Sequence, residues 1–282
     1  MGLDINAVQF LVAAKTRGAN FDRTATIGRQ GLGVFPRKVR TILEKNSLSA
    51  GAFAAAGPEC VFAEPLFAAL GARQVDAMDN SDFEGAKLLH DLNQPIPPEW
   101  KAQYDAVIDG GTLEHVFNFP VALRNVMEMV RPGGRLFIHN IANNFCGHGF
   151  YQFSPELFYR TLSPENGFCV ERMILHRIGP YGAWWEVADP NVIHQRTELF
   201  TFTPMNILVQ ARRTEVKEIF AVTPQQSDYS ALWALGKRKT GPFANPLFAG
   251  PARLFSALKT GMDFWRRQSL GNRKFFKKVP RE

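Results

Sequence analysis

Short apolar runs alternate with amphipathic stretches along most of the chain. Apolar residues at helical spacing predict helices over residues 3–15, 36–46, 60–71, 119–130 and 154–166. Continuous apolar runs bounded by turn residues predict strands over residues 25–28, 74–78, 87–91, 104–109, 135–142, 169–178 and 206–213. Because strands and helices mostly alternate, we expect an α/β fold with a doubly wound, mostly parallel sheet.

The end of this pattern differs from its beginning. An aromatic and polar stretch at 181–204 separates the last two strands, without an obvious helix between them. Strands joined in this way favour an antiparallel hairpin at the C-terminal edge of the sheet. We expect one domain over residues 1–236, with a helical insertion at about 31–58, and a distinct tail over residues 237–282.

Composition narrows the class of protein. Of the 282 residues, 45% are hydrophobic, as in ordinary globular proteins. Cys60, Cys146 and Cys169 are widely spaced and form no CxxC pair, which favours reduced thiols and argues against a zinc site; we predict no metal. The chain shows no signal peptide and no apolar run near the roughly 20 residues that span a bilayer. We therefore expect a soluble, cytoplasmic protein.

The net charge of +7 is concentrated in the tail. Residues 237–282 carry 12 basic and two acidic residues, whereas the remainder carries 21 basic and 24 acidic ones. This distribution makes nucleic acid an improbable partner for the main domain. Within residues 251–270, an apolar helical face is formed by Leu254, Phe255, Leu258, Met262 and Trp265. A basic amphipathic helix can lie on an anionic membrane surface, or it can pack back onto its own domain.

Candidate ligand-binding residues follow several of the predicted strands. Parallel strands place their carboxyl ends at one edge of a sheet, where ligands bind in doubly wound folds. The first strand is followed by Gly28, Arg29 and Gln30, the second by Asp79, the third by Asp91 and Leu92, and the fourth by Asp109, Gly110 and Gly111. Each has an ordinary structural alternative, since Asp and Gly also favour plain turns.

The order of these motifs resembles the class I S-adenosylmethionine-dependent methyltransferase family. The likeness spans about residues 25–213 and depends on the strand-end aspartates and on the runs YDAVIDGGTLEHV, MVRPGGRLFI and SPELFYRTLSPENGF. It implies a Rossmann-like fold that binds S-adenosylmethionine, with Asp79 at the ribose and Asp91 at the adenine. The glycine run after the first strand, TIGRQGLGVF, departs from the family pattern because no acidic residue precedes it and no helix follows directly.

The acceptor side is expected after the fourth and fifth predicted strands. His148, His115 and Tyr151 are the candidate catalytic groups, because an imidazole with a pKa of about 6.5 can remove a proton from an incoming hydroxyl. Packing and loop hydrogen bonds are the ordinary alternative for both histidines. Trp184 and Trp185 would suit stacking on a sugar, although aromatic residues near a sheet edge usually pack.

These patterns predict a methyltransferase that acts on an oxygen of a glycan or another small polar acceptor, in polysaccharide biosynthesis. Its membrane contact, if any, would be peripheral and through the tail. The main alternative is a non-catalytic methyltransferase-like binding or scaffold protein that has lost the first glycine motif. A dinucleotide oxidoreductase is less well supported, because no GxGxxG opens a helix after the first strand.

Overall fold

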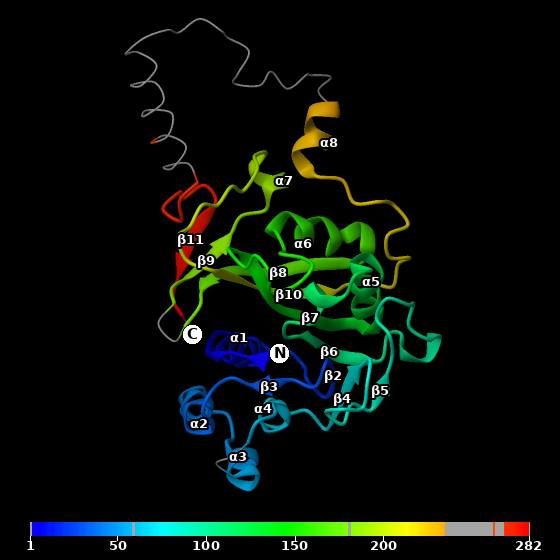
Figure 1. Cartoon of the computed structure of the whole chain (residues 1–282), viewed down its shortest axis with the longest axis vertical. Coiled ribbons are helices and arrows are strands. Elements are labelled where there is room, and N and C mark those ends of the chain that lie inside the picture. The colour runs from blue at the N-terminus through cyan, green and yellow to red at the C-terminus, as the bar shows by residue number, and fades with distance from the viewer. Residues whose placement is uncertain (1, 58–59, 180–181, 235–261, 263–267, 282) are drawn as a thin grey trace, which may run out of the picture.

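The computed structural model describes residues 2–57, 60–179, 182–234, 262 and 268–281. Its centre is a nine-stranded sheet with the order β11-β9-β8-β10-β7-β6-β2-β4-β5 (Figure 1). The strands are β2 Arg23–Ile27, β4 Gln74–Asp79, β5 Leu88–Leu89, β6 Tyr104–Asp109, β7 Val130–Asn143, β8 Phe168–Arg177, β9 Trp184–Val187, β10 Met205–Arg213 and β11 Phe276–Val279. A separate parallel pair joins β1 Gly2–Leu3 to β3 Gly31–Leu32.

Helices cover both faces of the sheet (Figure 1). They are α1 Ile5–Thr16, α2 Pro36–Lys45, α3 Gly51–Ala56, α4 Glu64–Ala69, α5 Phe119–Met129, α6 Pro155–Thr161, α7 Pro190–Ile193 and α8 Ser227–Ala234. One hydrophobic core packs α1, α2 and α4 against one face, and a second core packs α5 and α6 against the other. The two cores form because successive side chains of a strand point to opposite faces.

The parallel half of the sheet confirms the predicted fold. The strands β5, β4, β2, β6 and β7 pair in parallel, and the chain order reverses between β2 and β6. This is a Rossmann-like, doubly wound arrangement, in which the crevice at the reversal point is the usual ligand site. The run RPGG, residues 131–134, resembles a turn in sequence but is continuous with β7.

The structure confirms that the C-terminal strands pair antiparallel, but their position in the sheet differs from the prediction. Strands β8 and β10 pair antiparallel, as expected, yet β10 lies between β7 and β8 and not at the edge. The edge is formed by β9 and β11, which the sequence pattern did not predict. Local periodicity identifies a strand but contains no information about which strand becomes its neighbour.

Part of the basic tail belongs to the sheet. Residues 276–279 form β11, and Phe275 and Phe276 are fully buried. Arg281 Nε donates to Gln9 Oε1 on α1 at 2.6 Å, so the tail also contacts the N-terminal helix. Most of the amphipathic helix predicted at 251–270 lies outside the described residues. Within the part of the chain that is described, no helix is long and apolar enough to cross a bilayer.

Candidate functional site

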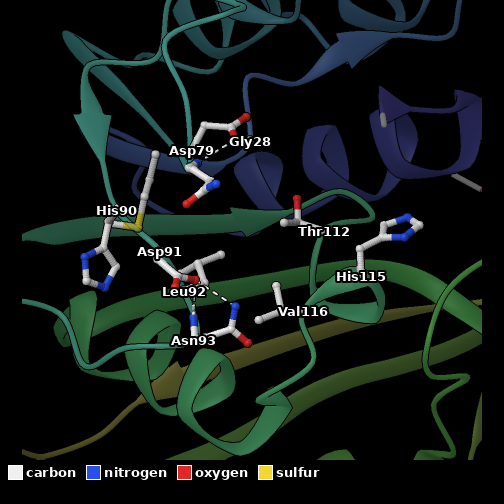
Figure 2. Close-up of a pocket in the computed structure, with 11 residues that line it drawn as sticks. Gly28, Asp79, His90, Asp91, Leu92, Asn93, Thr112, His115 and Val116 are labelled. Carbon is white, nitrogen blue, oxygen red and sulfur yellow. Dashed lines mark hydrogen bonds between the residues drawn. The ribbon is translucent and has the colours of Figure 1, made fainter.

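A pocket of about 330 Å³ opens at the carboxyl ends of the parallel strands (Figure 2). The wall comes from the segments that follow β2, β4, β5 and β6. The lining residues are Gly28, Met78, Asp79, Asn80, His90, Asp91, Leu92, Asn93, Thr112, His115 and Val116. The volume lies in the range of small-molecule sites, and the pocket occupies the edge at which doubly wound sheets bind ligands.

The turn after β2 makes room for the pocket. Gly28 has a φ of +72°, a conformation that residues with side chains rarely adopt. Its N–H donates to the carbonyl oxygen of Met78 at 2.6 Å, which holds the ends of β2 and β4 together. The chain therefore leaves the sheet without placing a side chain over the strand ends.

Two aspartates provide the negative charge of the pocket. Asp79 Oδ1 accepts the Asn80 N–H at 2.6 Å, and Asp91 Oδ1 accepts the backbone N–H and the side-chain amide of Asn93. The bonds from Asn93 lower the pKa of Asp91, so its carboxyl is ionised at neutral pH. Within the described part of the chain, Oδ2 of neither aspartate accepts a hydrogen bond. Both carboxylates can therefore accept hydrogen bonds from a ligand.

The crevice between β2 and β6 is partly filled by the protein itself. Thr112 Oγ1 donates to the Ile27 carbonyl at 2.7 Å and so bridges the two loops. Gln30 is buried, and its Nε2 donates to the Ile27 and Gly28 carbonyls. Its Oε1 has no hydrogen-bond partner within the described part of the chain. A Cβ added to Gly110 would lie 2.0 Å from this Oε1 and 3.1 Å from Leu3 Cδ2. Gly110 is thus covered and does not line the pocket.

A buried carboxylate pair stands behind the pocket. Asn140 Nδ2, on β7, donates to Asp109 Oδ2 at 3.0 Å and to Glu114 Oε2 at 2.7 Å. Burial, together with the smaller effect of the nearby Glu114 carboxylate, raises the pKa of Asp109 to about 7. Burial also raises the pKa of Glu114. Asp109 Oδ1 accepts the Thr112 and Leu113 N–H groups, so it shapes the loop that presents Thr112 to the pocket.

The candidate bases lie at one end of the pocket. His115 lines it, on the opposite side of the labelled group from His90 in Figure 2. His148 does not line the pocket, but its ring centroid lies 5.4 Å from that of His115. Burial and the neighbouring His148 lower the pKa of His115, which keeps the imidazole neutral at pH 7. The Tyr151 hydroxyl donates to the Phe117 carbonyl at 2.7 Å and so supports the loop.

The structure brings together five of the predicted site residues in the pocket wall: Gly28, Asp79, Asp91, Leu92 and His115. The others lie outside the wall. Arg29 forms an ion pair with Glu64 at 2.6 Å and packs on the Phe62 ring, so it joins the loop after β2 to α4. Asp109 is the last residue of β6. The turn that follows contains Gly110 and Gly111, and Gly111 has a φ of +97°.

Several lining residues were not predicted. Met78, His90 and Asn93 flank strand ends that the sequence did identify, and Thr112 lies one position beyond the glycine pair. The sequence signal for the pocket came from the residues next to them, where an aspartate or a glycine follows an apolar run. The bridge that Asn140 forms between two carboxylates depends on a contact between β6 and β7 that no local pattern contains.

Comparisons with known proteins concern the fold. No protein-family model matches the chain, and no curated protein matches it. The N-methyltransferase NodS from Bradyrhizobium japonicum WM9 is a similar solved structure, with 12% identity over 74% of this chain and 94% of that one and a TM-score of 0.41. The 1,6-didemethyltoxoflavin-N1-methyltransferase of Burkholderia thailandensis shows 13% identity over 75% and 80% of the two chains, with a TM-score of 0.38.

A third similar structure has a different activity in its name. The C9 mutein of the branched-chain polyamine synthase of Thermus thermophilus, solved with N4-aminopropylspermidine and 5′-methylthioadenosine, shows 11% identity over 76% of this chain and 58% of that one, at a TM-score of 0.38. Likenesses of this size describe the fold alone. The function must be inferred from the side chains of the pocket.

Proposed function

We propose that this chain is an S-adenosylmethionine-dependent methyltransferase of the class I type. The observation that supports the proposal most strongly is the pocket at the ends of β2, β4 and β5, where Gly28, Asp79 and Asp91 converge. A carboxylate with an unused oxygen after β4 is suited to ribose hydroxyls, and a polar and apolar pair after β5, Asp91 and Leu92, is suited to adenine. The fold places all of them at the expected edge of the sheet.

The residues present fit the adenosyl part of this cofactor. The pocket of about 330 Å³ has room for an adenosyl group, and the oxygens of Asp79 and Asp91 are available. At the amino-acid end, Gln30 covers Gly110 and carries a buried acceptor without a partner. Gln30 must therefore shift before the amino-acid end of the ligand can reach Gly110, so this side chain opposes binding at that end.

The cofactor supplies a methyl group on a positively charged sulfur. Bound in the pocket, the cofactor would supply that methyl group to an acceptor oxygen, with the electron pair of the broken C–S bond left on sulfur. The chain's part is to align the two reactants and to accept the hydroxyl proton. His115 is suited to that role because its imidazole is neutral at pH 7 and lies at the pocket wall.

A glycan or other small polar hydroxyl compound is the acceptor class that we propose. The support is the polar loop after β7, whose His148 ring lies 5.4 Å from that of His115 at the end of the pocket. The basic residues of 237–282 would additionally favour binding to an anionic membrane surface, so the reaction would take place there. This proposal rests on the sequence of that segment.

Titration with S-adenosylhomocysteine tests the proposal. We expect saturable binding in calorimetry, and we expect Asp79→Ala to weaken it about ten- to a hundred-fold, because a charge-assisted pair of hydrogen bonds to the ribose is lost. Asp82→Ala is the matched control, since Asp82 lies on the same loop, is exposed and does not line the pocket. Equal affinities of the wild type and Asp79→Ala would contradict the assignment of Asp79.

A non-catalytic binding or scaffold protein is the second candidate. It is favoured by one observation, the filling of the space over Gly110 by Gln30 and Leu3. Under this alternative, millimolar S-adenosylhomocysteine would neither bind to the wild type nor raise its melting temperature. The Asp79→Ala variant would show the same absence of binding and of a temperature shift. The same titration therefore separates the two candidates.

A further inference from the structure

Three potential metal ligands meet at the histidine end of the pocket. Glu114 Oε1 lies 3.7 Å from His115 Nε2 and 3.8 Å from His148 Nε2. We call these three residues the edge cluster; one candidate ligand atom from each lies within 4.8 Å of those of the other two. The carboxylate is almost fully buried, whereas the histidine side chains are 41% and 50% exposed. A solute can therefore reach the imidazoles while the carboxylate stays fixed beneath them.

The edge cluster is held in place by its surroundings. Glu114 Oε2 accepts the Asn140 amide, which leaves Oε1 directed at the histidines. The Glu114 carbonyl accepts the Phe150 and Tyr151 N–H groups, and a Cβ on Gly149 would come within 2.8 Å of that carbonyl oxygen. The loop that carries His148 is thus fastened to the residue beside His115. Ligands that are oriented before binding favour a metal site.

The spacing of the atoms is suited to a cation better than to direct hydrogen bonds. Distances of 3.7 and 3.8 Å exceed those of a hydrogen bond. Ligand atoms around a tetrahedral ion at about 2.1 Å lie roughly 3.4 Å apart, so a small inward movement would complete the coordination. Two imidazoles and one carboxylate prefer ions of the zinc, manganese and iron group over magnesium or calcium. Three protein ligands leave further positions open.

We propose that Glu114, His115 and His148 bind a divalent transition-metal cation whose open positions take up a hydroxyl oxygen of the acceptor. The second part rests on the proposed function, because it places the acceptor beside the methyl group. His115 belongs both to the edge cluster and to the pocket wall, so the cation would lie at the border between the two. Binding of a hydroxyl to such an ion lowers the hydroxyl's pKa and orients its oxygen. With the ion bound, His115 is a ligand and not the base, and the hydroxyl proton passes to solvent at the exposed side of the cluster.

The test uses the full chain, stripped with a chelator and dialysed. Calorimetric titration with Zn²⁺, and Mn²⁺ titration followed by electron paramagnetic resonance, should each show one site per chain. We expect His148→Ala and Glu114→Gln to weaken binding at least about ten-fold, since a ligand is lost. His148→Ala changes an exposed side chain, so its melting temperature should match the wild type. Exposed His194→Asn and buried His139→Ala are the controls and should retain binding.

Each outcome decides between the proposals. Absence of binding, or equal binding by His148→Ala, would overturn the cation site, while normal S-adenosylhomocysteine affinity in the same preparation would leave the proposed function standing. Loss of cation binding in His139→Ala alone would also overturn the proposed site, because the ion would then bind at the cluster that contains His139. If the ion binds, bound Mn²⁺ should broaden the proton resonances of S-adenosylhomocysteine. Sharp resonances at saturation of both would overturn the link to the acceptor.

Discussion

Two groups of one carboxylate and two histidines lie near the same end of β7, on opposite faces of the sheet. The edge cluster of Glu114, His115 and His148 is held by Asn140, whereas a buried cluster is formed by Asp4, His139 and His176. His139 and Asn140 are consecutive on β7 and therefore point to opposite faces. One strand end thus supports two sets of the same chemical groups.

Burial separates what the two sets can do. In the buried cluster His176 is fully buried and Asp4 caps α1, with Oδ1 accepting the Asn6 and Ala7 N–H groups. His139 Nδ1 and His176 Nε2 have no hydrogen-bond partner among the residues that the structure describes. Burial lowers the pKa of His139, and that of His176 to about 4. Protonation of the imidazoles in the buried cluster therefore affects the free energy of unfolding, whereas the imidazoles of the edge cluster are accessible to ligands.

The largest expected effect is on the pH dependence of stability. The pKa of His176 is about 4 in the folded chain and about 6.5 in the unfolded chain, so the unfolded state gains the proton first as the pH falls. The stabilisation is complete above pH 6.5 and is lost towards pH 4, on the order of 3 kcal/mol. Besides burial, the groups that affect this pKa are Asp4 and the Arg177 carbonyl, which raise it, and His139 and Arg281, which lower it.

Urea unfolding at a series of pH values measures this loss. His176→Gln, which cannot be protonated, should flatten the curve between pH 6.5 and pH 4, whereas exposed His194→Asn should leave its slope unchanged. A slope retained by His176→Gln would show that the acid sensitivity arises elsewhere and that burial does not distinguish the two clusters in this way.

A smaller effect is expected on the other face. Asn140→Ala removes the donor shared by Asp109 and Glu114 and leaves both buried carboxylates without it, which should cost about 2 kcal/mol of the free energy of unfolding. Asn143→Ala is the matched control on the same strand. Its amide makes a half-buried bond to Thr201 at 3.1 Å, so a loss of only about 1 kcal/mol is expected. Equal losses would mean that the carboxylate pair does not depend on Asn140.

The smallest effect concerns a third buried polar side chain. Gln30→Ala removes the group that covers Gly110 and should tighten S-adenosylhomocysteine binding about three- to ten-fold, because the amino-acid end of the ligand then meets no side chain there. Thermal-shift titration measures the change, with exposed Asn80→Ala, at the adenosyl end, as a comparison. Weaker binding by Gln30→Ala would instead show that its Oε1 is a ligand of the cofactor.

The sequence predicted what depends on local pattern. The parallel strands, the helices α1, α2 and α5, and the strand-end aspartates 79 and 91 all follow from apolar runs and the residues that end them. The positions of β10 and β11 did not, because neighbouring strands are chosen by contacts across the whole chain. Gln30 shows the same limit within the site: its sequence context suggested cofactor contact, but its side chain lies over Gly110, a residue of another loop that is distant in the sequence.

The placement of β10 has a consequence for biosynthesis. In the finished sheet, β8 and β9 connect to β7 only through β10, which the ribosome makes after both of them. During translation, β8 and β9 therefore lack the strand that joins them to β7 until residues 205–213 emerge from the ribosome. A pause or truncation before that segment would leave apolar strand edges open to other chains, and such a chain would depend on chaperones.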